Sequence, residues 1–74
     1  MSQLPRVSGR EVVKALRKLG YELDRQHGSH IVMRQTDEPH RRLTVPDHGE
    51  IAKGTLRAII RQSGLTVDEF KALL

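Results

Sequence analysis

Apolar residues recur at helical spacing in the first third of the chain. They form one stripe on a helix, made of Val12, Val13, Leu16 and Leu19. Ser8 and Glu11 have the spacing of a capping box, in which each side chain binds a free backbone amide at the start of a helix. Gly20 stands where many helices end in a left-handed residue. Together these signals predict a helix over residues 9–19.

Three short segments then alternate apolar and polar residues, as half-buried strands do. They are residues 21–24, 30–34 and 42–45, the last of which ends at Pro46. Residues 27–29 supply turn formers, and residues 36–41 form a loop that contains Pro39. Because these connections are short, the sequence favours an antiparallel meander.

The alternation also sorts the predicted strand residues onto two faces of the sheet. One face is apolar and should pack against helices: Tyr21, Leu23, Ile31, Met33, Leu43 and Val45. The other face carries His30, Arg34, Arg42 and Thr44. A sheet covered on one side leaves its other side open to water. We therefore expect a polar, locally basic open face with His30 on it.

The last third of the chain predicts two further helices. The first opens at Gly54 or Thr55, has Leu56, Ile59 and Ile60 on its apolar side, and closes at Gly64. Thr66 and Glu69 form a second capping box. The short helix that follows should bury Val67, Phe70, Leu73 and Leu74. The expected class is α+β, with three antiparallel strands, helices on one face, and the order α-β-β-β-α plus a short final helix.

Size and composition narrow the protein class. Seventy-four residues predict a single domain, 1–74. The absence of cysteine excludes disulfides and thiolate metal sites, and it fits a reducing cytoplasm. No stretch approaches the roughly 18 apolar residues of a membrane span, and the N-terminus has no secretory pattern. We expect a cytoplasmic protein with no membrane association.

Charge points to a polyanionic partner. Thirteen Lys and Arg residues against nine Asp and Glu residues give a formal net charge of +4. Between Glu50 and Asp68 no acidic residue occurs, while Lys53, Arg57 and Arg61 recur every four positions. On a helix this spacing makes one basic stripe, which either binds phosphates or is simply a solvated face. Since aromatic residues for base stacking are nearly absent, any contact with RNA should run through phosphates and sugars.

Histidine is the candidate for proton transfer near neutral pH, because its unperturbed pKa is about 6.5. Four are present: His27, His30, His40 and His48. His30 has the best setting, because it enters a strand after Gly28, which allows close backbone approach, and Ser29, whose hydroxyl can bind a phosphate oxygen. The alternative is a surface histidine after a turn. His27 and His40 are interpreted as turn and loop residues, and His48 as a loop residue that could approach the sheet.

Other kinds of site find little support in the sequence. No two histidines have helical i, i+4 spacing with a carboxylate cluster, so no metal site is indicated. Ser29 lacks a visible His/Asp relay that would make it a nucleophile. Gly28 and Ser29 also lack the glycine spacing and the lysine of a phosphate-binding loop.

Three ordered stretches resemble the HicA family of toxins from type II toxin–antitoxin modules. Residues 12–21 are similar to the family's opening helix and the start of its first strand. Gly28-Ser29-His30, followed by an apolar run that ends in Arg34, is similar to its most specific motif. Residues 45–48 and 53–64 are similar to its closing segment. The resemblance covers most of the chain, in order and at the expected spacing.

The resemblance implies a double-stranded-RNA-binding-domain-like fold and a ribosome-independent mRNA endoribonuclease. Because RNA carries its own nucleophile, the 2′-hydroxyl, we expect no cofactor. The resemblance places the family's catalytic histidine on His30, acting as general acid or base, and implies a HicB-type antitoxin as partner. Residues expected to bind RNA are Ser29, Arg34, Arg42, Lys53 and Arg57. Two alternatives stay open: a non-catalytic RNA-binding module of the same fold, and a protein-interaction domain whose basic surface binds an acidic partner.

Overall fold

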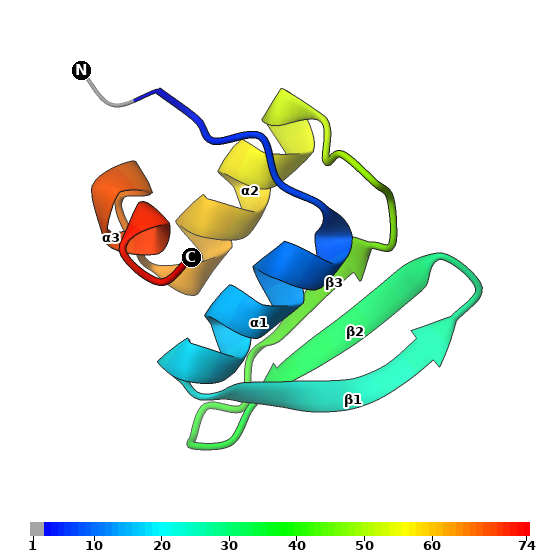
Figure 1. The fold of residues 1–74 in the computed structure, drawn as a ribbon. Helices are drawn as coiled ribbons and strands as arrows, with labels where there is room; N and C mark the ends of the chain where they lie inside the picture. Colours follow the sequence, from blue (N-terminus) through cyan, green and yellow to red (C-terminus); the bar gives the residue numbers. More distant parts are fainter. Residues whose placement is uncertain (1–2) are drawn as a thin grey trace.

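The computed structural model describes residues 3–74 and has the predicted α+β architecture (Figure 1). The elements are α1 (Gly9–Leu19), β1 (Tyr21–His27), β2 (His30–Gln35), β3 (Arg42–Pro46), α2 (Lys53–Ser63) and α3 (Val67–Lys71). The helices lie together on one side of the sheet, as predicted, and leave the other side open (Figure 1). Within residues 3–74, no helix has the length and apolar character needed to cross a bilayer.

The sheet is antiparallel, with strand order β1-β2-β3. β1 is longer than predicted: it continues through His27, so that the turn shrinks from three residues to Gly28 and Ser29. A bulge between Leu23 and Arg25 interrupts the register of β1 with β2. Beyond Tyr21 every residue of this edge strand is exposed, and hydropathy therefore gave no signal for its second half.

Helix boundaries follow the capping signals where these exist. Ser8 and Glu11 bind each other's backbone amides at 3.1 and 2.9 Å, and Gly20 ends α1 with φ 108°. The same box begins α3, so both predicted starts are confirmed. α2 begins at Lys53, slightly before the predicted start. The sequence gives no signal at this boundary, because the side chain of the N-cap residue Ala52 forms no capping hydrogen bond.

The core lies between the helices and the sheet. Its buried side chains are Val7, Val12, Ala15, Leu16, Tyr21, Ile31, Met33, Leu43, Val45, Ile51, Leu56, Ile59, Ile60 and Phe70. Most were predicted by periodicity. Val7 and Ile51 were not, because each is an isolated apolar residue outside a periodic segment. The amide of Ile51 donates to the carbonyl of Val7 at 2.8 Å, and this bond ties the segment before α1 to the segment before α2.

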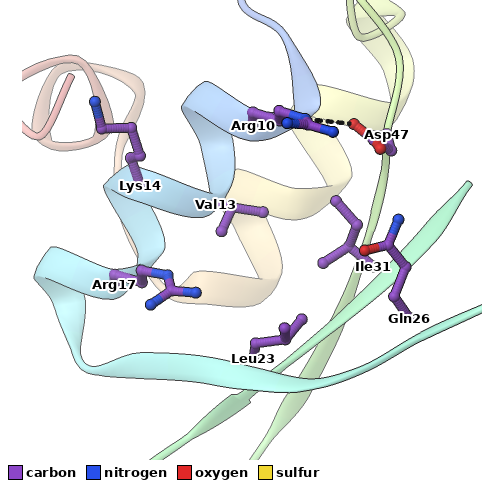
Figure 2. Close-up of a pocket in the computed structure, with 8 residues that line it drawn as sticks. All are labelled: Arg10, Val13, Lys14, Arg17, Leu23, Gln26, Ile31 and Asp47. Atoms are coloured by element: carbon purple, nitrogen blue, oxygen red, sulfur yellow. Dashed lines mark hydrogen bonds and ion pairs between the residues drawn. The ribbon is translucent and has the colours of Figure 1, made fainter.

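Three residues predicted to be buried are exposed. Leu23 and Leu74 are each 47% exposed, and Leu19 is 37% exposed. Leu23 is on the helix-facing side of the edge strand β1, where it lines an open hollow below α1 (Figure 2). Leu19 is the last residue of α1, and Leu74 lies beyond the end of α3. The predicted burial is thus wrong for apolar residues at the ends of helices and at the edge of the sheet.

Gly9 provides a test of how tightly α1 is seated on β3. Its amide donates to the carbonyl of His48 at 2.9 Å, and a Cβ at this position would overlap the carbonyl oxygen of Pro46. We expect Gly9→Ala to destabilise the fold by about 1–3 kcal/mol, as overpacking does, measured by urea unfolding. Gly54→Ala is the matched control, because it enters open space on α2 and should stabilise the helix. Equal stability of both variants would contradict this seating.

Tyr21 predicts an alkaline loss of stability. Its buried hydroxyl has no hydrogen-bond partner among the described residues, and burial raises its pKa, which nearby Arg41 partly offsets. Because the folded state favours the neutral phenol, the contribution of the Tyr21 phenol to the free energy of unfolding is complete below about pH 10. This contribution is lost as the pH rises above that value. Tyr21→Phe should be at least as stable at pH 7, since an unpartnered hydroxyl costs about 1–3 kcal/mol, and its stability should fall less steeply above pH 10. Urea unfolding at pH 7 to 11 tests this; a less stable Phe variant at pH 7 would contradict it.

Candidate functional site

The β1–β2 turn holds His30 at the start of a strand that is fixed on both sides. Gly28 adopts φ 56°, a conformation that glycine tolerates at the first position of a two-residue hairpin turn. The side-chain amide of Gln26 donates to the carbonyl of Gly28 at 3.0 Å. On the β3 side, the amide of Asp47 donates to the carbonyl of Ser29 at 2.6 Å. His30 therefore stands on an anchored element.

His30 is exposed on the open face of the sheet, as predicted. Along β2 its neighbour Ile31 is buried against the helices, and the two side chains of successive strand residues point to opposite faces. Its cross-strand partners are Pro46 on β3 and His27 on β1. His27, which we interpreted as a turn residue, is thus a strand residue directly opposite His30. The spacing of two turn residues between the histidines was the signal for this pairing.

The bulge in β1 decides which residues join His30 on the open face. Simple alternation from Tyr21 and Leu23 would place Arg25 and His27 against the helices. The bulge shifts the register, so that Arg25 pairs with Val32 and His27 with His30. Arg25 and His27 therefore share the open face with His30. Neither belonged to the predicted site.

Two acidic residues of β1 form ion pairs with the two predicted arginines of this face. Arg34 Nη1 is 3.5 Å from Glu22 Oε1, and Arg42 Nε is 3.0 Å from Asp24 Oδ2. The expectation of a locally basic face is therefore only partly met, since two of its predicted cations have carboxylate partners. Arg25 forms no salt bridge with any residue from 3 to 74, and it lies two positions from His27 on the same strand.

The basic stripe of α2 is on a different part of the molecule. Lys53, Arg57 and Arg61 are exposed, but α2 belongs to the helical layer (Figure 1). Arg57 and Arg61 line a hollow of about 350 Å³ together with Leu4 near the N-terminus. The structure thus brings His30, Arg34 and Arg42 to the open face, places Ser29 in the adjoining turn, and separates Lys53 and Arg57 from them.

A further basic surface lies on α1. Arg10, Lys14 and Arg17 follow one side of the helix above Leu23 of β1, around a hollow of about 380 Å³ (Figure 2). Arg10 Nε is 3.4 Å from Asp47 Oδ1, which ties this edge of the helix to the segment after β3 (Figure 2). This hollow is on the helix side of the sheet, so it opens away from His30.

His40 lies at the far end of β2 from His30, and no side-chain hydrogen bond joins His48 to His30 within residues 3–74. The Nδ1 atom of His40 is 3.2 Å from the carbonyl oxygen of Gln35, in the loop between β2 and β3. His48 is exposed after β3, and its carbonyl accepts the amide of Gly9. Within residues 3–74, no three His, Asp or Glu side chains gather in a way that could hold a metal ion.

A comparison with protein families identifies the family to which the chain belongs. The family model described as HicA toxin of bacterial toxin-antitoxin matches residues 9–65. The match extends from the start of α1 past the end of α2 and includes the β1–β2 hairpin with His30. The chain belongs to the HicA toxin family. This HicA-family protein is a toxin of the toxin–antitoxin kind, and its family implies an antitoxin partner. A search of curated proteins finds no match.

The cross-strand ion pairs predict that two carboxylates limit polyanion binding on the sheet face. In Glu22→Gln and Asp24→Asn, Arg34 and Arg42 lose their partners and become free for phosphates. We expect tighter binding of fluorescent oligouridine, with a log–log salt slope steeper by about 0.7 for each added phosphate contact. Titrations at several NaCl concentrations measure both quantities.

Glu50→Gln is the matched control, since it removes the same charge from the exposed loop after β3. If this control tightened binding as much as the two test variants, net charge would account for the effect, and the arginines would have no special role.

Proposed function

We propose that this HicA-family toxin is an mRNA endoribonuclease in which His30 is the general acid or general base. One observation supports this most: within the family's match, an exposed imidazole stands on an anchored strand of an open, polar sheet face. A rigid strand holds a proton-transfer group in position better than a loop tip does. As an mRNA-directed enzyme, the protein would act in the cytoplasm as one domain, 1–74.

The protein does not have to supply a nucleophile, because RNA carries its own. The 2′-oxygen attacks the adjacent phosphorus, the bond from phosphorus to the 5′-oxygen breaks, and a 2′,3′-cyclic phosphate forms. His30 either removes the proton from the 2′-hydroxyl or gives a proton to the departing 5′-oxygen. This route requires neither a metal ion nor a covalent enzyme intermediate.

The charged residues around the site are proposed to bind the RNA backbone. Ser29 donates its hydroxyl to a phosphate oxygen, and Arg34 and Arg42 offset the charge that develops on phosphorus. Their partly exposed ion pairs with Glu22 and Asp24 are worth about 0–1 kcal/mol each, so a phosphate can compete with the carboxylates.

RNA recognition should depend on charge and shape. Tyr21 and Phe70 are 3% and 0% exposed, so neither aromatic ring is available to stack on bases. Lys53 and Arg57, on the helical layer, would bind phosphates of a strand that passes beyond the sheet face. Such contacts position a substrate without reading its sequence.

The antitoxin is proposed to act at the same face. A HicB-type partner that covers the open side of the sheet would block RNA from His30, and it would relieve the growth arrest without altering the toxin's fold. The acidic residues already present on β1 show that this face accommodates carboxylates beside its arginines.

His30→Ala tests the proposed activity. One acid–base group contributes about 10²–10⁴-fold to the rate, so the variant should cleave mRNA that much more slowly while it binds oligouridine nearly as well. Gel analysis of a labelled transcript gives the rates, and circular dichroism confirms the fold. His40→Asn is the control, since it removes another imidazole and asparagine tolerates the φ of 56° at that position.

Two results would contradict the proposal. Undiminished cleavage by His30→Ala would remove His30 from the site. If the parent protein bound RNA and left it intact, the chain would be the non-catalytic RNA-binding module instead.

A further inference from the structure

His27 and His30 form a directly opposed pair on the open face of the sheet. They flank the two-residue turn of the β1–β2 hairpin and are cross-strand partners. Directly opposed residues of an antiparallel pair point to the same face, with Cβ atoms about 4.5–5.5 Å apart. Both residues are exposed. Two imidazoles therefore stand side by side at a place where a phosphodiester can reach both.

RNA cleavage by the 2′-hydroxyl needs two proton transfers at two different oxygens. One group must take the proton of the 2′-hydroxyl as the 2′-oxygen bonds to phosphorus. Another must give a proton to the 5′-oxygen as its bond to phosphorus breaks. Because the attacking and leaving oxygens lie on opposite sides of phosphorus, one imidazole cannot serve both in the same step. His30 alone leaves one of these transfers without a group.

We propose that His27 is the second acid–base group of this site, a role that rests on the proposed endoribonuclease function. One imidazole of the pair accepts the 2′-hydroxyl proton, and the imidazolium of the other protonates the 5′-oxygen. The pair ends the step with one proton moved from the second ring to the first, and exchange with water restores the starting state. His27 is thus a catalytic residue alongside His30.

The surroundings of the pair suit this division of work. The reaction needs one acid and one base at the same phosphodiester, and the two rings are directly opposed across the strands. The pair's neighbour on β3, Pro46, adds no charge.

The other charged groups of the face are placed in order along the sheet. Arg25 lies nearest, two positions from His27 on β1, and has no salt bridge within residues 3–74. The two ion pairs, Arg34 with Glu22 and Arg42 with Asp24, lie further along the strands. The cations of α1 are on the other side of the sheet. Arg25 is therefore the cation best placed to hold the phosphate against the pair.

The first experiment measures the pH dependence of kcat for the parent, His27→Gln and His30→Gln. With one base and one acid, the parent should show a bell-shaped profile. Each variant should be about 10²–10⁴-fold slower and should lose one limb of the bell, a different limb in each, with KM little changed. His40→Asn should keep both limbs, and circular dichroism should show the same fold for all four proteins.

The second experiment assigns the roles with an RNA whose scissile 5′-oxygen is replaced by sulfur. A thiolate leaves without a proton, because a thiol is far more acidic than an alcohol. The variant that lacks the acid should therefore recover on this substrate, and the variant that lacks the base should not. Recovery of either single variant supports the pair and states which ring is the acid.

Two kinds of result would overturn the inference, and both are distinguishable from failure of the proposed function. If His27→Gln cleaved as fast as the parent, or kept both limbs of the profile, His27 would not transfer protons while His30 could still do so. If its loss lay entirely in KM, His27 would bind RNA without catalysing. If the parent did not cleave either RNA, the proposed function itself would fail.

Discussion

The two-residue turn at Gly28 and Ser29 fixes how β1 pairs with β2, and the sheet face depends on that pairing. Because side chains alternate between faces, a slip of one residue would turn His30 toward the helices and expose Ile31 and Met33. Each such side chain contributes about 1.5–3 kcal/mol by its burial, so the core strongly resists the slip. The position of His30 is thus set by the same apolar residues that stabilise the fold.

Much of this fold could be predicted from the sequence, for local physical reasons. The capping boxes at Ser8 and Thr66 marked two helix starts, and the glycines after α1 and α2 marked two helix ends. Alternation identified all three strands, and together with helical periodicity it identified most of the core. The predictions failed for features that have no local signal in the sequence. α2 begins after an uncapped Ala52, and Ile51 is buried through long-range packing alone.

The candidate site was less predictable than the fold, because it depends on pairing between strands. His30 could be chosen from its own neighbourhood in the sequence. Arg25 could not, because the bulge in β1 reverses the face to which alternation assigns it, and for His27 the length of the turn was the only signal. The carboxylate partners of Arg34 and Arg42 were also hidden, since each ion pair joins residues from different strands. A single irregularity in an edge strand therefore changes the composition of the whole face.

RNA that is cut by its own 2′-hydroxyl at the His30 face must carry characteristic ends, and the chemistry of those ends is the most direct test of the proposed reaction. A synthetic RNA should be incubated with the purified toxin in the presence of EDTA, and the product masses should be determined. We expect fragments that end in a 2′,3′-cyclic phosphate, with 5′-hydroxyl groups on their partners. Fragments with 3′-hydroxyl and 5′-phosphate ends would show that water, and not the RNA, is the nucleophile, and would contradict the account.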